Sequence, residues 1–330
     1  MSECRFVRNQ RGIGANSRLT ENASVIAAGF RWTLSSSALA AILLVPAGRS
    51  FAAQISGDFP EACSPANLEV STTVAGLVFR SYRDKSDGTA CVQVLRGGKL
   101  LVQDSIGNDG YYTLGQRPDP ETGRNVPPIA NGTDLTGRGR PDMIITSFSG
   151  GLCCSSTSIY ELRPALRLLA KMDGGFFSDL DHRHYDYHTS EETFAGWPGS
   201  YDDSPVVNVI LRFRNEGSRS GYHLALDAMH KPAPTPQEWA QQLATARATF
   251  THDRGAWFAG PTLWQPVLQL IYTGHADLAW KFLDEAWPAS IPEKDQWIYG
   301  FCSLLRRSPY WPDLKSTIGH PPPACLAPEP

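Results

Sequence analysis

The stretch 131–158, NGTDLTGRGRPDMIITSFSGGLCCSSTS, decides how this chain folds. It begins with a loop rich in Asp and Gly, continues with an alternating apolar segment that contains Met143 and Ile145, and reaches a second segment at 155–160 through a Gly-Gly pair. Alternation at every second residue is typical of a strand, and a Gly pair permits a tight reversal of the backbone. The stretch therefore predicts a loop, a strand, a turn and an antiparallel partner strand.

Short strand signals separated by turn residues continue on both sides of this stretch. We expect strands at 72–82, 90–95, 100–104, 111–114, 166–171, 206–214 and 222–228. A loop rich in Pro, Asn and Gly at 116–131 interrupts them and is expected to be exposed. Strands and turns at this spacing are typical of sheets built from hairpins, so residues 54–230 are predicted to form an antiparallel β domain.

The composition changes after residue 230. Thr235, Pro236 and Glu238 have the order of a helix cap, a first helical residue and the acidic partner of a capping box. Residues 263–272 and 276–287, joined by a turn with Gly274, predict an antiparallel helical hairpin. The fold class is thus α+β, with a small all-α domain at 231–312 and a Pro-rich tail at 313–330 that is loose unless Cys325 holds it.

The first 53 residues are predicted to be an export signal and leader. Several arginines precede an apolar run at 39–45 that is too short to span a bilayer, and the small residues Ser50 and Ala52 fit cleavage after Ala52. A buried N-terminal helix is the alternative. We expect a periplasmic or secreted protein with no membrane span once the signal is removed.

The cysteines that follow the predicted signal are even in number, which favours disulfides in an exported chain. The disulfide candidates are Cys63, Cys91, Cys153, Cys154, Cys302 and Cys325. The adjacent Cys153 and Cys154 either pair with each other or lie on opposite faces of a strand, each joined to another cysteine such as Cys91.

The charge distribution gives no reason to expect nucleic acid as a partner. The formal net charge is -3, and charges of both signs are interspersed without a basic stripe. A protein, a peptide or a glycan remains as the kind of partner that such a surface could bind.

The loop at the start of the quoted stretch has part of the spacing of a calcium loop. Asp134, Thr136 and Asp142 place side-chain oxygens at the first, third and ninth positions, whereas Arg138 occupies the fifth. Asp179 and Asp181 begin a second candidate loop in the same way. There too an arginine, Arg183, stands at the fifth position.

The shared arginine suggests an internal substitute for the cation. A guanidinium that forms a bidentate pair with Asp134 or Asp142 would supply the positive charge without an ion. Our hypothesis is therefore a loop without a cofactor, in which Arg138 and Arg183 replace the metal. Bound calcium is the alternative.

The segment Asp134-Leu-Thr-Gly-Arg-Gly-Arg-Pro-Asp142, followed by a Ser-Gly-Gly turn and Cys153-Cys154, resembles the FG-GAP/VCBS-type repeats of exported bacterial proteins of unknown function. The resemblance covers about residues 85–230, with a second, eroded copy from Asp179. It implies blade-like hairpin units of the kind that build calcium-binding β-propellers, some of which serve adhesion. Too few β residues are present for a full propeller, so a partial propeller or a sandwich is expected.

No catalytic residue is assigned from the sequence. The leading interpretation is an exported binding or structural module of the bacterial envelope, with degenerate calcium-loop-like turns. The rival interpretation is a metal-dependent hydrolase that uses the loop from Asp179 to His188, where histidines and aspartates are densest. Most tryptophans lie between Trp239 and Trp311, where they either line a groove or pack in a helical core.

Overall fold

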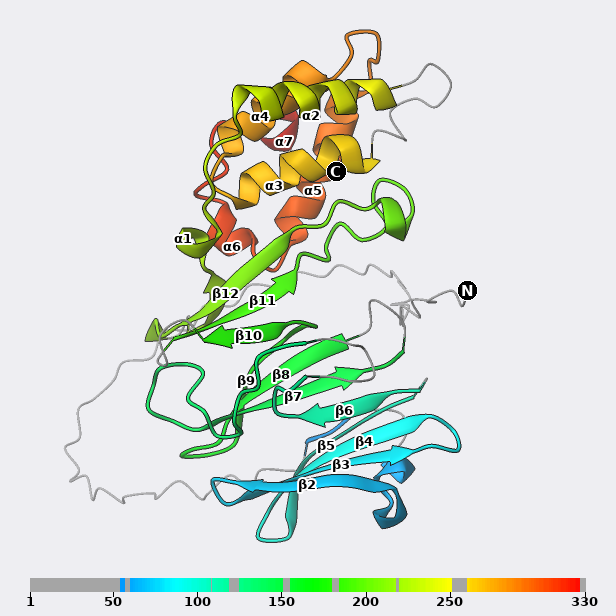
Figure 1. Cartoon of the computed structure of the whole chain (residues 1–330), viewed down its shortest axis with the longest axis vertical. Helices are drawn as coiled ribbons and strands as arrows, with labels where there is room; N and C mark the ends of the chain where they lie inside the picture. Colours follow the sequence, from blue (N-terminus) through cyan, green and yellow to red (C-terminus); the bar gives the residue numbers. More distant parts are fainter. Residues whose placement is uncertain are drawn as a thin grey trace, which may run out of the picture. The chain divides into compact units, whose positions relative to one another are not determined.

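The computed structural model describes residues 54–56, 60–107, 109–118, 125–150, 155–179, 184–217, 220–250 and 260–326. The described chain folds into antiparallel sheets followed by helices, so the α+β class is confirmed (Figure 1). The predicted export signal, Cys153 and Cys154 lie outside the described residues. None of the described helices combines the length and the apolar character needed to cross a membrane.

The strands form three open sheets. The first has the order β1-β5-β4-β3-β2, the second β6-β7-β8-β9 and the third β10-β11-β12-β13. Their bounds are β1 (Gln54–Ile55), β2 (Leu68–Val74), β3 (Leu77–Asp84), β4 (Thr89–Arg96), β5 (Lys99–Ile106), β6 (Tyr111–Leu114), β7 (Asp142–Phe148), β8 (Ser155–Glu161), β9 (Arg167–Asp173), β10 (Phe176–Asp179), β11 (Tyr185–Ser190), β12 (Asn208–Arg214) and β13 (Gly221–Leu224).

Each sheet contains an antiparallel meander in which consecutive strands pair. β1 is the exception, because it pairs with β5 in parallel through Gln54 and Val102. Three meanders in sequence agree with the expected hairpin units. Their assembly into a partial propeller stays a prediction, because the strand orders show open sheets and no ring.

The strand pair predicted from the quoted stretch is confirmed. β7 and β8 are antiparallel, with Asp142 opposite Glu161 and Ile144 opposite Ile159. Met143 and Ile145 belong to the hydrophobic core that the second sheet shares with the first, whereas Ile144 belongs to a core that includes the third sheet. Both faces of β7 are therefore covered.

Several predicted strand boundaries were wrong. The expected strand at 72–82 is two strands, β2 and β3, which reverse at Ala75 and Gly76 with φ of 51° and 82°. The expected strand at 222–228 ends at Leu224, and a helical turn, α1 (Leu226–Met229), follows it. The expected loop around Asp179 and His188 is largely the hairpin of β10 and β11, in which Tyr187 is fully buried.

The helices follow the third sheet. They are α2 (Pro236–Thr249), α3 (Gln265–Tyr272), α4 (Ala276–Ala286), α5 (Lys294–Arg307), α6 (Trp311–Leu314) and α7 (Pro323–Leu326), with a π-helical turn, η6 (Gly260–Trp264), before α3. Short 3-10 helices are η1 (Pro60–Cys63), η2 (Pro65–Asn67) and η3 (Tyr201–Asp203).

The predicted capping box at the start of α2 is present. The Glu238 amide donates to the Thr235 hydroxyl at 3.3 Å, and the Thr235 amide donates to the Glu238 carboxylate at 2.8 Å. Such a cap stabilises a helix by about 1 kcal/mol. The helical hairpin is also confirmed, as α3 and α4 joined at Gly274, whose φ is 88°.

The third sheet and the helices share one hydrophobic core. Trp264, Trp280 and Trp287 are buried in it, while Trp239 and Trp297 pack against it half-buried. These tryptophans therefore pack in the helical region.

A buried polar contact also joins the third sheet to the helices. Glu191, directly after β11, accepts hydrogen bonds from the Tyr272 hydroxyl at the end of α3 and from the Ser308 hydroxyl after α5. The end of β11 is thereby fixed to two helices.

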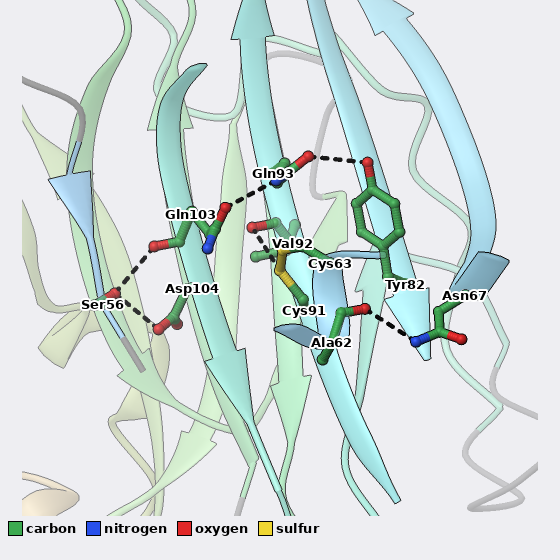
Figure 2. The surroundings of a disulfide bond; sticks show 10 residues. All are labelled: Ser56, Ala62, Cys63, Asn67, Tyr82, Cys91, Val92, Gln93, Gln103 and Asp104. Carbon is green, nitrogen blue, oxygen red and sulfur yellow. Dashed lines mark hydrogen bonds between the residues drawn. A yellow bond between two sulfur atoms is a disulfide. The ribbon is translucent and has the colours of Figure 1, made fainter. Parts of the chain in front are cut away.

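Two disulfides join segments that are distant in sequence. Cys63 of η1 is bonded to Cys91 of β4, beside the Tyr82-Gln93-Gln103 hydrogen-bond row of the first sheet (Figure 2). Of the alternatives left open for Cys153 and Cys154, a bond from either of them to Cys91 is therefore wrong, because η1 packs over β4 and places Cys63 against Cys91.

The second disulfide lies in the helical region. Cys302 of α5 is bonded to Cys325 of α7, and the Arg306 guanidinium donates to the Cys325 carbonyl at 2.6 Å. The part of the tail around Cys325 is thus held against α5.

Candidate functional site

The loop that precedes β7 is organised around the carboxylate of Asp134. Its Oδ1 accepts hydrogen bonds from the amides of Thr136 at 3.3 Å and Arg138 at 3.1 Å, and its Oδ2 accepts one from the Gly139 amide at 2.6 Å. Gly137 and Gly139 have φ of 68° and 71°, a backbone conformation that glycine adopts without strain. The loop therefore curls so that its own amides surround the acid.

Asp142, the first residue of β7, closes the loop. It is 1% exposed, and its Oδ2 accepts from the Leu135 amide at 3.0 Å and from the Thr136 hydroxyl at 3.3 Å. Its Oδ1 is buried with no hydrogen-bond partner among the described residues. Burial raises the pKa of Asp142 to about 6, and the nearby Asp134 carboxylate raises it as well.

Arg138 points inward but pairs with a different acid from the one expected. Its Nη2 lies 2.5 Å from a carboxylate oxygen of Glu161, its Nε donates to the Thr136 hydroxyl at 3.1 Å, and its guanidinium lies 4.6 Å from the ring centre of Phe213. The expected bidentate pair with Asp134 or Asp142 is not formed. Glu161 faces Asp142 across the strand pair and is only 2% exposed. A buried carboxylate is costly unless a cation neutralises it, whereas the Asp134 carboxylate is already bound by backbone amides, so Arg138 stabilises Glu161 more than it would Asp134.

These contacts test whether the loop fits a calcium ion. Calcium requires oxygens that converge on one point, but the Asp134 oxygens already accept amide hydrogens, and a guanidinium enters from the fifth position. As they stand, the residues do not fit the ion. In the part of the chain that the structure describes, no three His, Cys, Asp or Glu side chains come together as metal ligands.

The second predicted loop is described only in part. Asp181, His182 and Arg183 lie outside the described residues, and Asp179 is the last residue of β10. Asp186 on β11 forms a bidentate pair with Arg212 of β12, at 2.7 and 2.8 Å. That acid therefore has a structural partner within the third sheet.

His188 of β11 lies between two cavities. One, of about 340 Å³, is also lined by Gly174, Gly175, Phe176, Ser190 and Asn208. The other, of about 380 Å³, is lined by His188, Asn208, Ile210, Met229, Lys231 and Gln269, among others. His188 and Asn208 line both cavities. We therefore treat the two cavities as one site and call it the His188 groove.

The position of the His188 ring is fixed by two contacts. Its Nε2 lies 2.7 Å from the Ser178 hydroxyl, and the ring stacks on Phe176 with 5.0 Å between centroids and an 11° angle. Both partners come from β10, the neighbouring strand. Burial lowers the pKa of His188, against an opposing effect of Asp186, so the neutral imidazole is favoured at neutral pH.

Helix α3 and the segment after α1 form the other wall of the groove. The Gln265 side-chain amide bonds to both the backbone N–H and the carbonyl of Val206, which fixes α3 beside the start of β12. Gln269 lies on α3, Thr273 directly follows this helix, and Lys231 follows α1. Within the described part of the chain, no Asp or Glu lines either cavity.

Gly174 and Gly175, at the other end of the groove, let the connection between β9 and β10 pass close to β8 and β11. A Cβ added at Gly175 would lie 2.1 Å from the His188 carbonyl oxygen, and one at Gly174 would lie 1.6 Å from the Ser155 hydroxyl. Only glycine permits this approach, so the first cavity depends on the Gly174-Gly175 pair.

Sequence reasoning singled out His188 but missed the rest of the groove. Asn208 begins a strand and carries no motif, and Gln265 and Gln269 are ordinary polar residues of a helix. A strand-like alternation at 185–190, with Tyr187 and Thr189 facing inward, was the available signal.

Comparison of the chain with protein-family models, with curated proteins and with solved structures found no match. The resemblance to FG-GAP/VCBS-type repeats therefore stays a prediction that rests on the residues quoted for it.

Proposed function

We propose that this protein is an exported binding module of the bacterial envelope, in which the His188 groove holds the ligand and the Asp134 loop braces two sheets. The observation that carries the proposal is the pair of cavities that share His188 and Asn208. A site of this size, whose walls combine apolar side chains with polar groups of fixed position, is typical of ligand recognition.

The bracing role of the Asp134 loop is supported by its contacts. Arg138 joins Glu161 of the second sheet to Phe213 of the third, and Leu135 is buried in the core that includes the third sheet. The polar groups of the Asp134 loop bond mainly to other groups of the protein. The His188 groove is therefore the better place for an external ligand.

The proposed export to the periplasm or the cell exterior is supported by the two disulfides, because disulfides persist in oxidising environments. We do not extend the proposal to the metal-dependent hydrolase, because Asp186, which lies on the same strand as His188, is paired with Arg212.

The proposal is tested by blocking the groove without disturbing the core. Asn208 is exposed and begins β12, so Asn208→Trp would fill the groove from a strand position that tolerates a large aromatic residue. Thr73→Trp, at an exposed position of β2 in the first sheet, is the matched control.

Wild type and both variants would be applied to arrays of glycans and peptides, after circular dichroism has confirmed that they fold alike. Ligands bound by wild type and Thr73→Trp should be lost by Asn208→Trp. An unchanged binding profile in Asn208→Trp would contradict the proposed site.

A further inference from the structure

We propose that the His188 groove binds an acidic saccharide, that is, a sugar unit that carries a carboxylate. This inference rests on the proposed function and names its ligand class. The sugar ring would lie against the stacked rings of Phe176 and His188, and the carboxylate would face Lys231.

The charge of the lining favours an anion. Among the described residues, Lys231 is the only Lys or Arg that lines the two cavities, and no described carboxylate lines either of them. The nearest acid in sequence, Asp227 of α1, is engaged by the Arg212 guanidinium at 3.0 Å. Of the described lining residues, a carboxylate in the groove would therefore meet one cation and no acid.

The remaining polar groups suit the hydroxyls of a sugar. Asn208 and Gln269 each present an amide that can donate and accept, and Ser190 presents a hydroxyl that can do the same. Neighbouring hydroxyls on a sugar ring have the same dual character. The Thr273 hydroxyl donates to the Gln269 carbonyl at 2.8 Å, so toward a ligand it can only accept. Phe176, Ile210 and Met229 add the apolar surface against which the C–H groups of a ring can pack.

An extended peptide is disfavoured by the state of the backbone. β11 and β12 are interior strands, so their amides and carbonyls pair with neighbouring strands. The N–H and carbonyl of Val206, just before β12, bond to the Gln265 amide. A peptide main chain that adds to a sheet needs free backbone groups, and these segments offer few of them.

The inference is tested by calorimetric titration of the full mature chain with four probes: glucuronate, the isosteric glucuronamide, neutral glucose, and N-acetyl-alanyl-alanine with a free carboxylate. The variants are Lys231→Gln, the charge-retaining Lys231→Arg, Asn208→Trp, and Lys85→Gln as a matched control on an exposed hairpin of the first sheet.

We expect wild type to bind glucuronate more tightly than glucuronamide or glucose. Lys231→Gln should weaken glucuronate binding about fivefold, since an ion pair with an exposed lysine contributes up to about 1 kcal/mol. Lys231→Arg and Lys85→Gln should retain it, and Asn208→Trp should abolish it.

The other outcomes separate the two proposals. If the peptide binds and Asn208→Trp blocks it while glucuronate does not bind, the groove is the site but the saccharide class is overturned. If glucuronate binds wild type and Lys231→Gln equally, the role of the charge is overturned. If glucuronate binding survives in Asn208→Trp, both the saccharide inference and the proposed site fail. Binding of none of the probes would overturn the acidic saccharide.

Discussion

The Asp134 loop and the His188 groove are both concentrations of polar residues, but they use those residues in opposite ways. In the loop, the Asp134 carboxylate is surrounded by backbone amides, and the Arg138 guanidinium forms an ion pair with Glu161. In the groove, Asn208, Lys231 and Gln269 line open space.

The difference teaches that a motif and a site need not coincide. The loop has the recognisable spacing, yet its groups stabilise the contact between the second and third sheets. The groove has no motif, yet its groups are oriented by the strands and α3 toward space that a ligand could fill. The following predictions test this contrast, from the largest expected effect to the smallest.

Glu161→Ala should destabilise the protein by about 3 to 5 kcal/mol, because it leaves the buried Arg138 without its carboxylate. The Arg138 side chain is 11% exposed and lies 2.5 Å from Glu161. Urea denaturation followed by circular dichroism measures the free energy of unfolding.

Arg167→Ala is the control for that measurement. Arg167 also contacts Glu161, at 3.5 Å, but its side chain is 55% exposed, so its removal should cost less than about 1 kcal/mol. Equal losses for Glu161→Ala and Arg167→Ala would show that the loop is not a buried brace.

Gly175→Ala should destabilise the protein by about 1 to 3 kcal/mol, because the added Cβ would collide with the His188 carbonyl oxygen and push the β9–β10 connection away from β11. Thermal unfolding and groove-ligand affinity should both decrease. Gly199→Ala, where an added Cβ meets nothing within 4 Å, should stay within about 0.5 kcal/mol of wild type. If Gly175→Ala left the stability unchanged, the groove wall would have to shift to accommodate the added methyl group without a cost.

Asp142→Asn should stabilise the protein by about 1 to 2 kcal/mol at about pH 8. Burial raises the pKa of Asp142 in the folded state to about 6, above its usual value. The protonated carboxyl therefore stabilises the fold at low pH, and this contribution is lost as the pH rises through about 6. Asparagine resembles the protonated form at every pH.

The difference in stability between Asp142→Asn and wild type should accordingly narrow as the pH falls through about 6 and close only below about 3.8, the ordinary pKa of the carboxyl, as measured by denaturation at a series of pH values. A variant that is less stable than wild type at about pH 8 would show that the loop depends on the negative charge.

The addition of calcium should have the smallest effect on stability. Millimolar calcium should shift the melting temperature by less than about 1 °C, because a ligand stabilises a fold only if it binds the native state. Magnesium at equal ionic strength is the control. A saturable increase of several degrees with calcium alone would show that the loop rearranges into a metal site.

Local patterns predicted much of the secondary structure. The hairpin of β4 and β5, the pair of β7 and β8, and the hairpin of α3 and α4 were all legible, because alternation, Gly turns and helix caps act between residues close in sequence. The hairpin of β10 and β11 was missed, because the density of Asp and His around residue 182 concealed the alternation that buries Phe177 and Tyr187.

By itself, the sequence determined the α+β order of the elements, the curled loop around Asp134 and the inward direction of Arg138. Only the tertiary structure decided that Arg138 meets Glu161, that Cys91 meets Cys63, and that α3 lies beside β12 to form a groove. The physical reason is distance along the chain. Turns and caps are set by neighbouring residues, whereas ion pairs, disulfides and cavities depend on which distant surfaces the packing of the core brings together.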